Sequence, residues 1–480
     1  MNVEDVVQEP DAPYMWFTRS RAERRCLARS SGDCRAAFRH NFKREGVSLS
    51  GEERWVMAEA RVPEALREPV GRFGLLRMVM LGVVHAAVFM GAIGSAQILL
   101  PIVITDIDPA NREINLGYVT GVAAFFGAVG GPIVGALSDR TTLRFGRRRP
   151  WMLAASVLSA GALAAMSWAA ESIVALILLW SLVGFANAAL LTAARAFIPD
   201  QVPEGQRGVA SGIFSLGLPL GTLLGTVLVA SVIEDTGTAF VVLAAVNVVS
   251  VVLFLIVFGD PPLPARARPP MRLGVFFRNF WINPREHPDF VYVWVTRVLV
   301  LLGWQMGTSY LLFFLEDAVG YEEMFPGRTA SQGVASLTII AIIAITALFL
   351  SSFVSGWISD KVGQRRPFVI GAGLLMGVSL LVLAFARDWP VLLAMAALLG
   401  LAIGMFIAVE LALITQLLPS AEDRGKDIGL VNLADSLPYS LGPLMAGFIV
   451  AHAGYPQMFV LAAVVTTVGA ILVTRIKGAR

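Results

Sequence analysis

The sequence predicts an all-α, polytopic membrane protein with twelve transmembrane helices in two pseudo-symmetric six-helix bundles. Composition gives the first reason. Of the 480 residues, 56% are hydrophobic and 15% are charged, and the mean hydropathy is +0.70, whereas soluble domains carry about 25% charged residues. The second reason is that long apolar runs alternate with charged loops. The third is that one charged loop pattern occurs twice.

The apolar runs supply twelve segments near the length of about 20 residues that a spanning helix needs. The first six are expected at 76–104, 115–137, 150–169, 173–198, 209–232 and 238–258, and the second six at 290–315, 332–356, 367–386, 390–417, 427–450 and 456–475. Pro199 and Pro419 close the fourth and tenth segments. Residues 259–289 are basic and proline-rich, and they separate the two sets of six.

These boundaries predict four parts of the chain. Residues 1–72 are polar and rich in Arg and Glu, and we expect a disordered cytoplasmic extension there. Residues 73–258 form the first bundle, 259–289 the cytoplasmic linker and 290–480 the second bundle.

Arginine and lysine set the expected orientation. They gather in alternate loops, including the stretch from 135 to 150 and the linker, while the opposite loops hold only Arg112, Arg328 and Arg387 among several acids. Cytoplasmic loops of membrane proteins carry the excess of basic residues. The pattern therefore predicts a multi-pass protein of the cell membrane with both termini in the cytoplasm. The basic residues indicate topology and not nucleic-acid binding.

The two halves are related by a fixed offset. Pro150 and Pro367 follow the two charged loops and are 217 residues apart, as are the glycines of Arg207-Gly208 and Arg424-Gly425. Parallel repeats of six helices are typical of secondary transporters.

The duplicated loop carries a family resemblance. Gly135, Asp139-Arg140 and Gly146-Arg147-Arg148-Arg149-Pro150 resemble the loop signature of the major facilitator superfamily, and a shorter copy begins at Gly356. The resemblance covers about residues 76–476 and implies a twelve-helix secondary transporter. Within that superfamily the loop is similar to the glycoside–pentoside–hexuronide:cation and sucrose:proton symporters. No acid lies in helices one, two and four, where the first of these families holds sodium.

Both copies of the loop are expected to form a conformational gate. An Asp at the end of helix two can lie against the positive end of another helix, and arginines of the loop can pair with an acid after helix four. The alternative is that the arginines only fix topology. The gate residues are Gly135, Asp139, Arg140, Arg147, Arg148 and Asp200, with Asp360, Lys361 and Arg365 in the second copy.

Ionisable residues inside the membrane are expensive and are candidates for function. Glu410 and Asp435 lie about midway through the membrane in helices ten and eleven, and His85 lies in helix one. A carboxyl in apolar surroundings can bind and release a proton, and histidine titrates near neutral pH. These three are the candidates for proton coupling. Each has a structural alternative, as a hydrogen-bond partner or a packed histidine.

The superfamily lines its central cavity with helices one, four, seven and ten, so polar residues there are candidates for the substrate site. The candidates are Gln97, Asn187, Arg297, Trp304, Gln305 and Tyr310. The alternatives are a helix–helix contact for each polar residue and snorkelling to the cytoplasm for Arg297.

The predicted function is secondary active transport of a small organic solute, by proton-coupled symport of a sugar or glycoside. The alternatives are a proton-linked efflux antiporter and a membrane sensor on the same fold. No phosphate-binding loop, catalytic constellation or metal-ligand spacing appears in the sequence, so we expect no enzyme, cofactor or metal. The expected partners are the solute, protons and the lipid bilayer, for a monomeric protein without nucleic acid. The identity of the solute and the direction of transport stay open.

Overall fold

The computed structural model describes most of the membrane body. The described residues are 69, 72–168, 172–231, 235–265, 268, 287–319, 330–416 and 424–476, and all belong to one unit, 64–480. The expected N-terminal extension, 1–72, lies almost entirely outside them, as does most of the linker 259–289. The boundaries of the four predicted parts stay predictions.

Helices account for all the expected segments. The first half contains α5 (Leu75–Gly94), η2 (Ser95–Leu99), α6 (Leu100–Ile107), α7 (Arg112–Ser138), α8 (Arg149–Met166), α9 (Ile173–Gln201), η3 (Glu204–Gln206), α10 (Arg207–Ser231) and α11 (Thr236–Val257). The second half contains α13 (Pro288–Ser309), α14 (Leu311–Asp317), α16 (Ala330–Val362), α17 (Arg366–Leu383), α18 (Trp389–Gln416), α19 (Arg424–Ala453), α20 (Tyr455–Leu472) and η5 (Val473–Arg475). Each of the twelve predicted segments falls on one helix or one consecutive run of helices, which confirms the fold class. Among the described residues, ten helices or runs are long and apolar enough to cross a membrane.

Two of the expected segments are interrupted. The first span passes from α5 through the π-helical turn η2 into α6. Pro101 has no N–H to donate to the carbonyl of Gln97, four residues earlier, so the regular α-helical ladder breaks there. The seventh span breaks at Tyr310, between α13 and α14.

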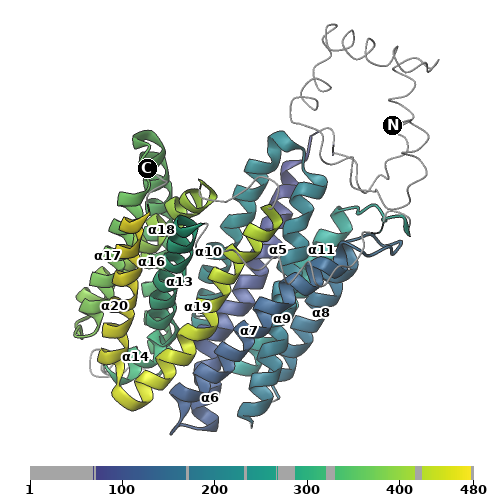
Figure 1. The fold of residues 1–480 in the computed structure, drawn as a ribbon. Coiled ribbons are helices and arrows are strands. Elements are labelled where there is room, and N and C mark those ends of the chain that lie inside the picture. The colour runs from purple at the N-terminus through teal and green to yellow at the C-terminus, as the bar shows by residue number, and fades with distance from the viewer. Residues whose placement is uncertain are drawn as a thin grey trace, which may run out of the picture. The chain divides into compact units, whose positions relative to one another are not determined.

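The two halves repeat the same packing. In the first half α7 and α8 pack on α9, α5 packs on α10, and α8 packs on α11. In the second half the equivalent pairs are α16 and α17 on α18, α13 on α19, and α17 on α20. Between the halves, α7 packs along α19 and α10 along α16. Figure 1 shows α19 beside α7, with the other helices of each half to either side.

The offset found in the sequence recurs in the backbone. α8 and α17 begin at residues 149 and 366, and α10 and α19 begin at 207 and 424, so each pair is 217 residues apart. Before α8 and α17 the chain turns at Gly146 and Gly363, whose φ angles are +111° and +70°. These two glycines are also 217 residues apart, and they adopt the left-handed conformation that favours glycine.

Small residues let the crossing helices approach closely. A Cβ atom added to Gly221 of α10 would lie 2.2 Å from the carbonyl oxygen of Ala86 in α5. A Cβ on Gly400 of α18 would lie 2.1 Å from the carbonyl oxygen of Ala344 in α16. Such close backbone contacts hold membrane helices together, because apolar side chains alone gain little by leaving lipid.

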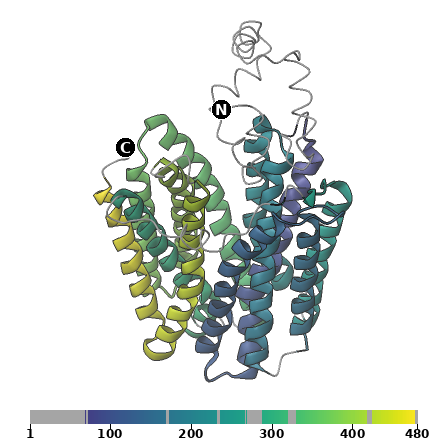
Figure 2. The ribbon, with the colours of Figure 1, turned by 45° about the vertical axis from the view of Figure 1, so that its right-hand side comes forward.

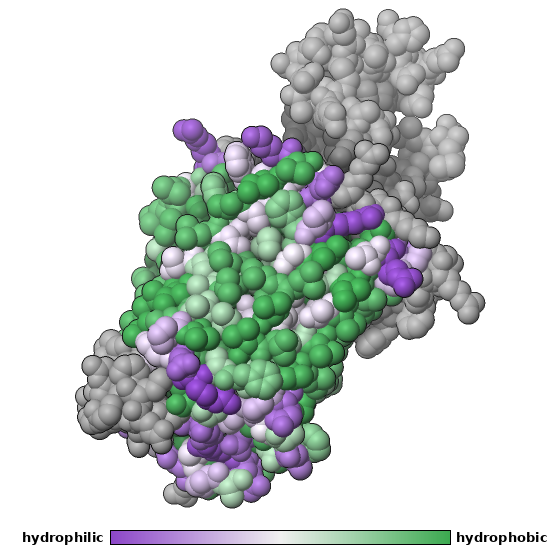
Figure 3. Space-filling view, turned by 90° about the vertical axis from the view of Figure 1, so that its left-hand side faces the viewer, coloured by the Kyte–Doolittle hydropathy of each residue, from purple (hydrophilic) through white to green (hydrophobic). Residues whose placement is uncertain are grey.

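The outer surface is apolar. Leu178, Phe353 and Val378 expose 66%, 79% and 57% of their surface. Figure 3 shows one face, on which apolar residues form a broad belt and polar residues gather toward its two ends. A belt of this kind is what a lipid bilayer covers.

Substitution at the crossing of α5 and α10 tests this packing. We expect Gly221→Val to destabilise the protein by about 1–3 kcal/mol, because the added side chain overpacks a backbone contact. The same change at Gly212, in the same helix but with nothing within 4 Å of the added atom, should cost much less. Thermal unfolding of the two purified variants in detergent measures the difference, and equal losses would contradict the packing described.

Candidate functional site

Three ionisable side chains meet inside the second half. Arg297 of α13 donates from Nη1 to Oε2 of Glu410 in α18, and its Nε lies 2.6 Å from Oδ1 of Asp435 in α19. The Glu410 side chain is fully buried, and Arg297 exposes 12% of its side chain. Removing a charge from water costs several kcal/mol, which only a partner of opposite charge and hydrogen bonds offset. We call these three residues the membrane ion network.

The membrane ion network extends from the interior to an exposed position. Oε1 of Glu410 is buried without a hydrogen-bond partner among the described residues, whereas Asp435 exposes 38% of its side chain. Tyr439, one turn further along α19, is 43% exposed. Arg195 of α9, in the other half, is exposed and interacts electrostatically with Asp435. Asp435 is therefore bonded to an arginine of its own half and is within electrostatic range of one from the opposite half.

The predicted gate residues of the first half form a second ion network. Nη2 of Arg147 lies 2.5 Å from Asp200, and Arg148 lies 3.1 Å from Asp200 and 2.6 Å from Asp139. Arg148 also donates to Ser138 Oγ at 2.6 Å. These contacts join the ends of α7, α8 and α9 within one half. The expected change of these contacts during transport stays a prediction.

Asp260 fixes the conformation of the same loop. Its Oδ2 accepts from the backbone N–H groups of Arg148 at 2.6 Å and Arg149 at 3.3 Å, at the start of α8. A Cβ on Gly146 would lie 2.5 Å from that carboxyl oxygen. The linker residue therefore caps a helix to which it is remote in sequence. Sequence reasoning missed Asp260, although its position directly after the last apolar run of the first half was visible.

The remaining gate residues make fewer contacts. Asp360 and Arg365 are 3.6 Å apart at an exposed position, and Lys361 lies 5.1 Å from the ring centre of Trp357. Gly135 allows α7 to approach Thr192 of α9, and Nη1 of Arg140 is buried without a partner in the described part of the chain. Asp200 and Asp260 both bind residues of the first loop. Among the described residues of the second copy, no acid makes equivalent contacts.

His85 and Asn187 make packing contacts inside the first half. The Nδ1 of His85 lies 2.6 Å from the carbonyl oxygen of Phe214, so this nitrogen donates, and the two rings stack at 4.1 Å. Asn187 accepts from Ser159 Oγ at 2.8 Å, between α9 and α8. Both side chains are buried. The structure does not bring them to the membrane ion network.

The other substrate-site candidates are spread along α5–α6 and α13. Gln97 lies in the π-helical turn and is half-buried, as are Trp304 and Gln305. Gln305 lies where α13 crosses α19 at Gly442. Tyr310 is buried, and its hydroxyl oxygen lies 2.7 Å from the carbonyl oxygen of Glu113 and 3.0 Å from that of Pro443, which share its single proton as acceptors. Tyr310 therefore joins the two halves, and its place in a substrate site stays a prediction.

Tyr310 belongs to a third group of contacts, which the sequence did not predict. Arg112 of α7 pairs with Asp317 of α14, and Asp317 accepts from the hydroxyl of Tyr455 at 2.6 Å. Ser440 donates to the carbonyl oxygen of Gly121 at 2.7 Å, again between α19 and α7. We call Arg112, Asp317, Tyr455 and Tyr310 the closing network, and the Ser440 contact lies further along α7 and α19. The sequence signal for these contacts was Arg112, a single arginine in a loop region otherwise rich in acids.

The closing network lies at one end of the interface between the halves. It involves the start of α7, the end of α13 with α14, and the start of α20. Figure 2 shows the two groups of helices close together at this end and further apart toward the opposite end. The gate residues of both copies are at that opposite end.

A family model described as the Major Facilitator Superfamily matches residues 81–351 and 324–478. The chain belongs to the major facilitator superfamily. This membership makes it a multi-pass membrane transporter and not an enzyme, and it confirms the family resemblance of the loop.

Relatives and solved structures of other facilitators are similar along most of the chain. The multidrug resistance protein MdtG of Dickeya zeae (strain Ech586) is 27% identical over 365 residues, covering 75% of this chain and 84% of that protein. MdtG of Escherichia coli O9:H4 (strain HS) is 24% identical over 357 residues, covering 74% and 82%. An inward-facing, unoccupied bacterial homologue of the human lysosomal transporter Spinster has TM-score 0.65 at 17% identity, covering 84% and 96%. The nucleoside transporter NupG has TM-score 0.65 at 13% identity, covering 84% and 99%.

Removing Arg297 tests the energetics of the membrane ion network. We expect Arg297→Ala to destabilise this facilitator by about 3–5 kcal/mol, because it leaves a buried carboxylate unpaired. Adding Glu410→Gln should recover part of the loss. Asp360→Ala, which removes an exposed pair, should cost less than about 1 kcal/mol. Unfolding in detergent measures all three, and the account fails if the double variant is no more stable than Arg297→Ala.

Proposed function

We propose that the protein exports small organic solutes in exchange for protons. The observation that carries this proposal is the membrane ion network, in which one guanidinium serves two carboxyl groups of different burial. Such a group can exist in two arrangements that differ by one proton, and this is the minimum that proton coupling requires.

The exchange follows from the charges. With both carboxyls ionised, Arg297 serves both, and a basic or hydrogen-bonding solute can compete with Arg195 for the carboxylate of Asp435. When Glu410 takes up a proton, Arg297 is free to pair with Asp435 alone, and this pairing weakens the attraction of Asp435 for the solute. Proton and solute therefore compete through Arg297. Competition of this kind gives antiport instead of symport.

The relatives support export. The facilitators at 24–27% identity are called multidrug resistance proteins, whereas the expectation of a sugar or glycoside rests on the loop motif alone. Among the described candidates for a sugar site, Asn187 and Tyr310 are engaged in helix contacts. We therefore prefer export to the sugar symport that the sequence favoured. The third reading, a membrane sensor, predicts no solute flux.

The closing network supports alternating access. We infer that it closes the non-cytoplasmic side of the interface, because the basic loops at the opposite end indicate the cytoplasm. A bacterial Spinster homologue of similar fold is inward-facing. In the proposed cycle the closing network opens when the halves rock to the other arrangement, with both termini in the cytoplasm and the gate residues controlling the cytoplasmic end.

Transport in liposomes tests the proposal. Purified protein is reconstituted, a pH gradient is imposed, and the movement of ethidium is followed by fluorescence. We expect ethidium to move against the direction of proton flow. Glu410→Gln should abolish this gradient-driven movement, because the proton step is lost, and Glu204→Gln, a matched change at an exposed surface position, should preserve it.

The same vesicles test the alternatives. Radiolabelled glycosides accumulating with the proton flow would support sugar symport and contradict export. Absence of any proton-dependent flux of either solute class would favour the sensor.

A further inference from the structure

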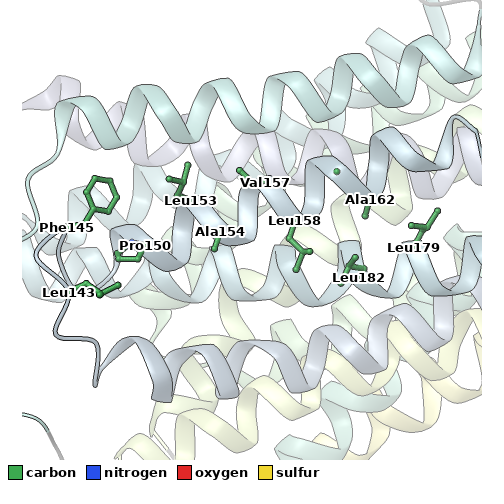
Figure 4. Close-up of a pocket in the computed structure, with 11 residues that line it drawn as sticks. Leu143, Phe145, Pro150, Leu153, Ala154, Val157, Leu158, Ala162, Leu179 and Leu182 are labelled. Atoms are coloured by element: carbon green, nitrogen blue, oxygen red, sulfur yellow. The ribbon is translucent and has the colours of Figure 1, made fainter.

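An apolar groove follows the outer side of the first half. It lies between α8 and α9 and has a volume of about 790 Å³ (Figure 4). All of its lining residues are apolar: Leu143, Phe145, Pro150, Leu153, Ala154, Val157, Leu158, Gly161, Ala162, Leu179 and Leu182. Val157 and Leu158 are 54% and 39% exposed, so the groove opens on the apolar surface and is not part of the membrane ion network.

The groove has the length of one lipid leaflet. Its lining on α8 runs from Pro150 to Ala162, which corresponds to about 18 Å at 1.5 Å per residue. One leaflet of the hydrocarbon core is about 15 Å thick. An extended acyl chain therefore matches the groove along its length.

The mouth of the groove is basic. Leu143 and Phe145 line it there, and Arg144 between them is exposed without an ion pair to any described residue. The guanidinium carbon of Arg149 lies 4.4 Å from the ring centre of Phe145. The apolar groove thus begins beside two positive charges, at the same end of the helices as the basic loops.

The mouth is held in a defined conformation. The hydrogen bonds from the backbone of Arg148 and Arg149 to Asp260 anchor the loop. The φ angle of +111° at Gly146 sets the turn that follows Phe145. The backbone turn from Leu143 to Gly146, closed by a 3.1 Å hydrogen bond between its ends, therefore has a defined course, which reduces the ordering cost of binding.

We propose that this groove is a binding site for an anionic phospholipid. One acyl chain lies along α8 and α9, and the phosphate-bearing headgroup contacts Arg144 at the mouth. The lining side chains are all apolar, which suits an acyl chain and not a hydrophilic solute. The positive mouth distinguishes an anionic lipid from a neutral one. This proposal is independent of the solute that the protein transports.

Native mass spectrometry of the full-length protein tests the site. The purified protein is mixed with equal amounts of phosphatidylglycerol and phosphatidylcholine of identical chains, and the retained lipids are counted. We expect wild type to retain phosphatidylglycerol preferentially. Arg144→Gln should reduce the preference on the order of fivefold, the effect of one arginine near an anionic surface. Arg77→Gln is the control, because Arg77 is another exposed arginine, at the start of α5.

A second pair of variants tests the acyl chain. Gly161 lines the groove and has nothing within 4 Å of an added Cβ, so Gly161→Leu adds bulk at the groove wall without a clash at the Cβ position. It should abolish retention of the phosphatidylglycerol molecule, while Gly371→Leu, at an equally open glycine of α17, should not. Equal retention of the two lipids by wild type would overturn the proposal. So would unchanged retention in Gly161→Leu, or equal effects of Arg144→Gln and Arg77→Gln.

Discussion

A buried ionised group needs a partner, and this constraint governs the second half of the protein. Glu410 is fully enclosed, so its charge is tolerable only while Arg297 donates to it. Arg297 in turn also holds Asp435. Three helices are therefore fixed relative to one another by one guanidinium. A change in the charge of any member alters the electrostatic forces on the other two.

The distribution of polar contacts separates rigid parts from the movable interface. The ion network of the basic loop and the membrane ion network each lie within one half, where they tie neighbouring helices together. Among the described residues, the hydrogen bonds and ion pairs of Arg112, Tyr310 and Ser440 cross between the halves. Halves that are stiff internally and joined by few polar contacts can rock as bodies.

The sequence predicted the fold well, because hydropathy and the 217-residue repeat depend on local composition. The position of Glu410 inside a membrane segment was also predictable, since it is a single acid in an apolar run. The partner of Glu410 was not, because the meeting of α13, α18 and α19 is a matter of tertiary packing. Tyr310 and Asn187 were expected near a solute, but a polar side chain on a membrane helix equally satisfies a carbonyl or a serine. Arg112 was treated as a topology signal, and its pairing with Asp317, 205 residues away, has no local signature.

The most direct test of the account is proton release on solute binding. Ethidium is added to purified protein in weakly buffered detergent, and a pH indicator follows the solution. The competition through Arg297 predicts that wild type releases a proton when ethidium binds, and that Glu410→Gln binds ethidium without releasing one. Binding without proton release in wild type, or undiminished release from Glu410→Gln, would contradict it.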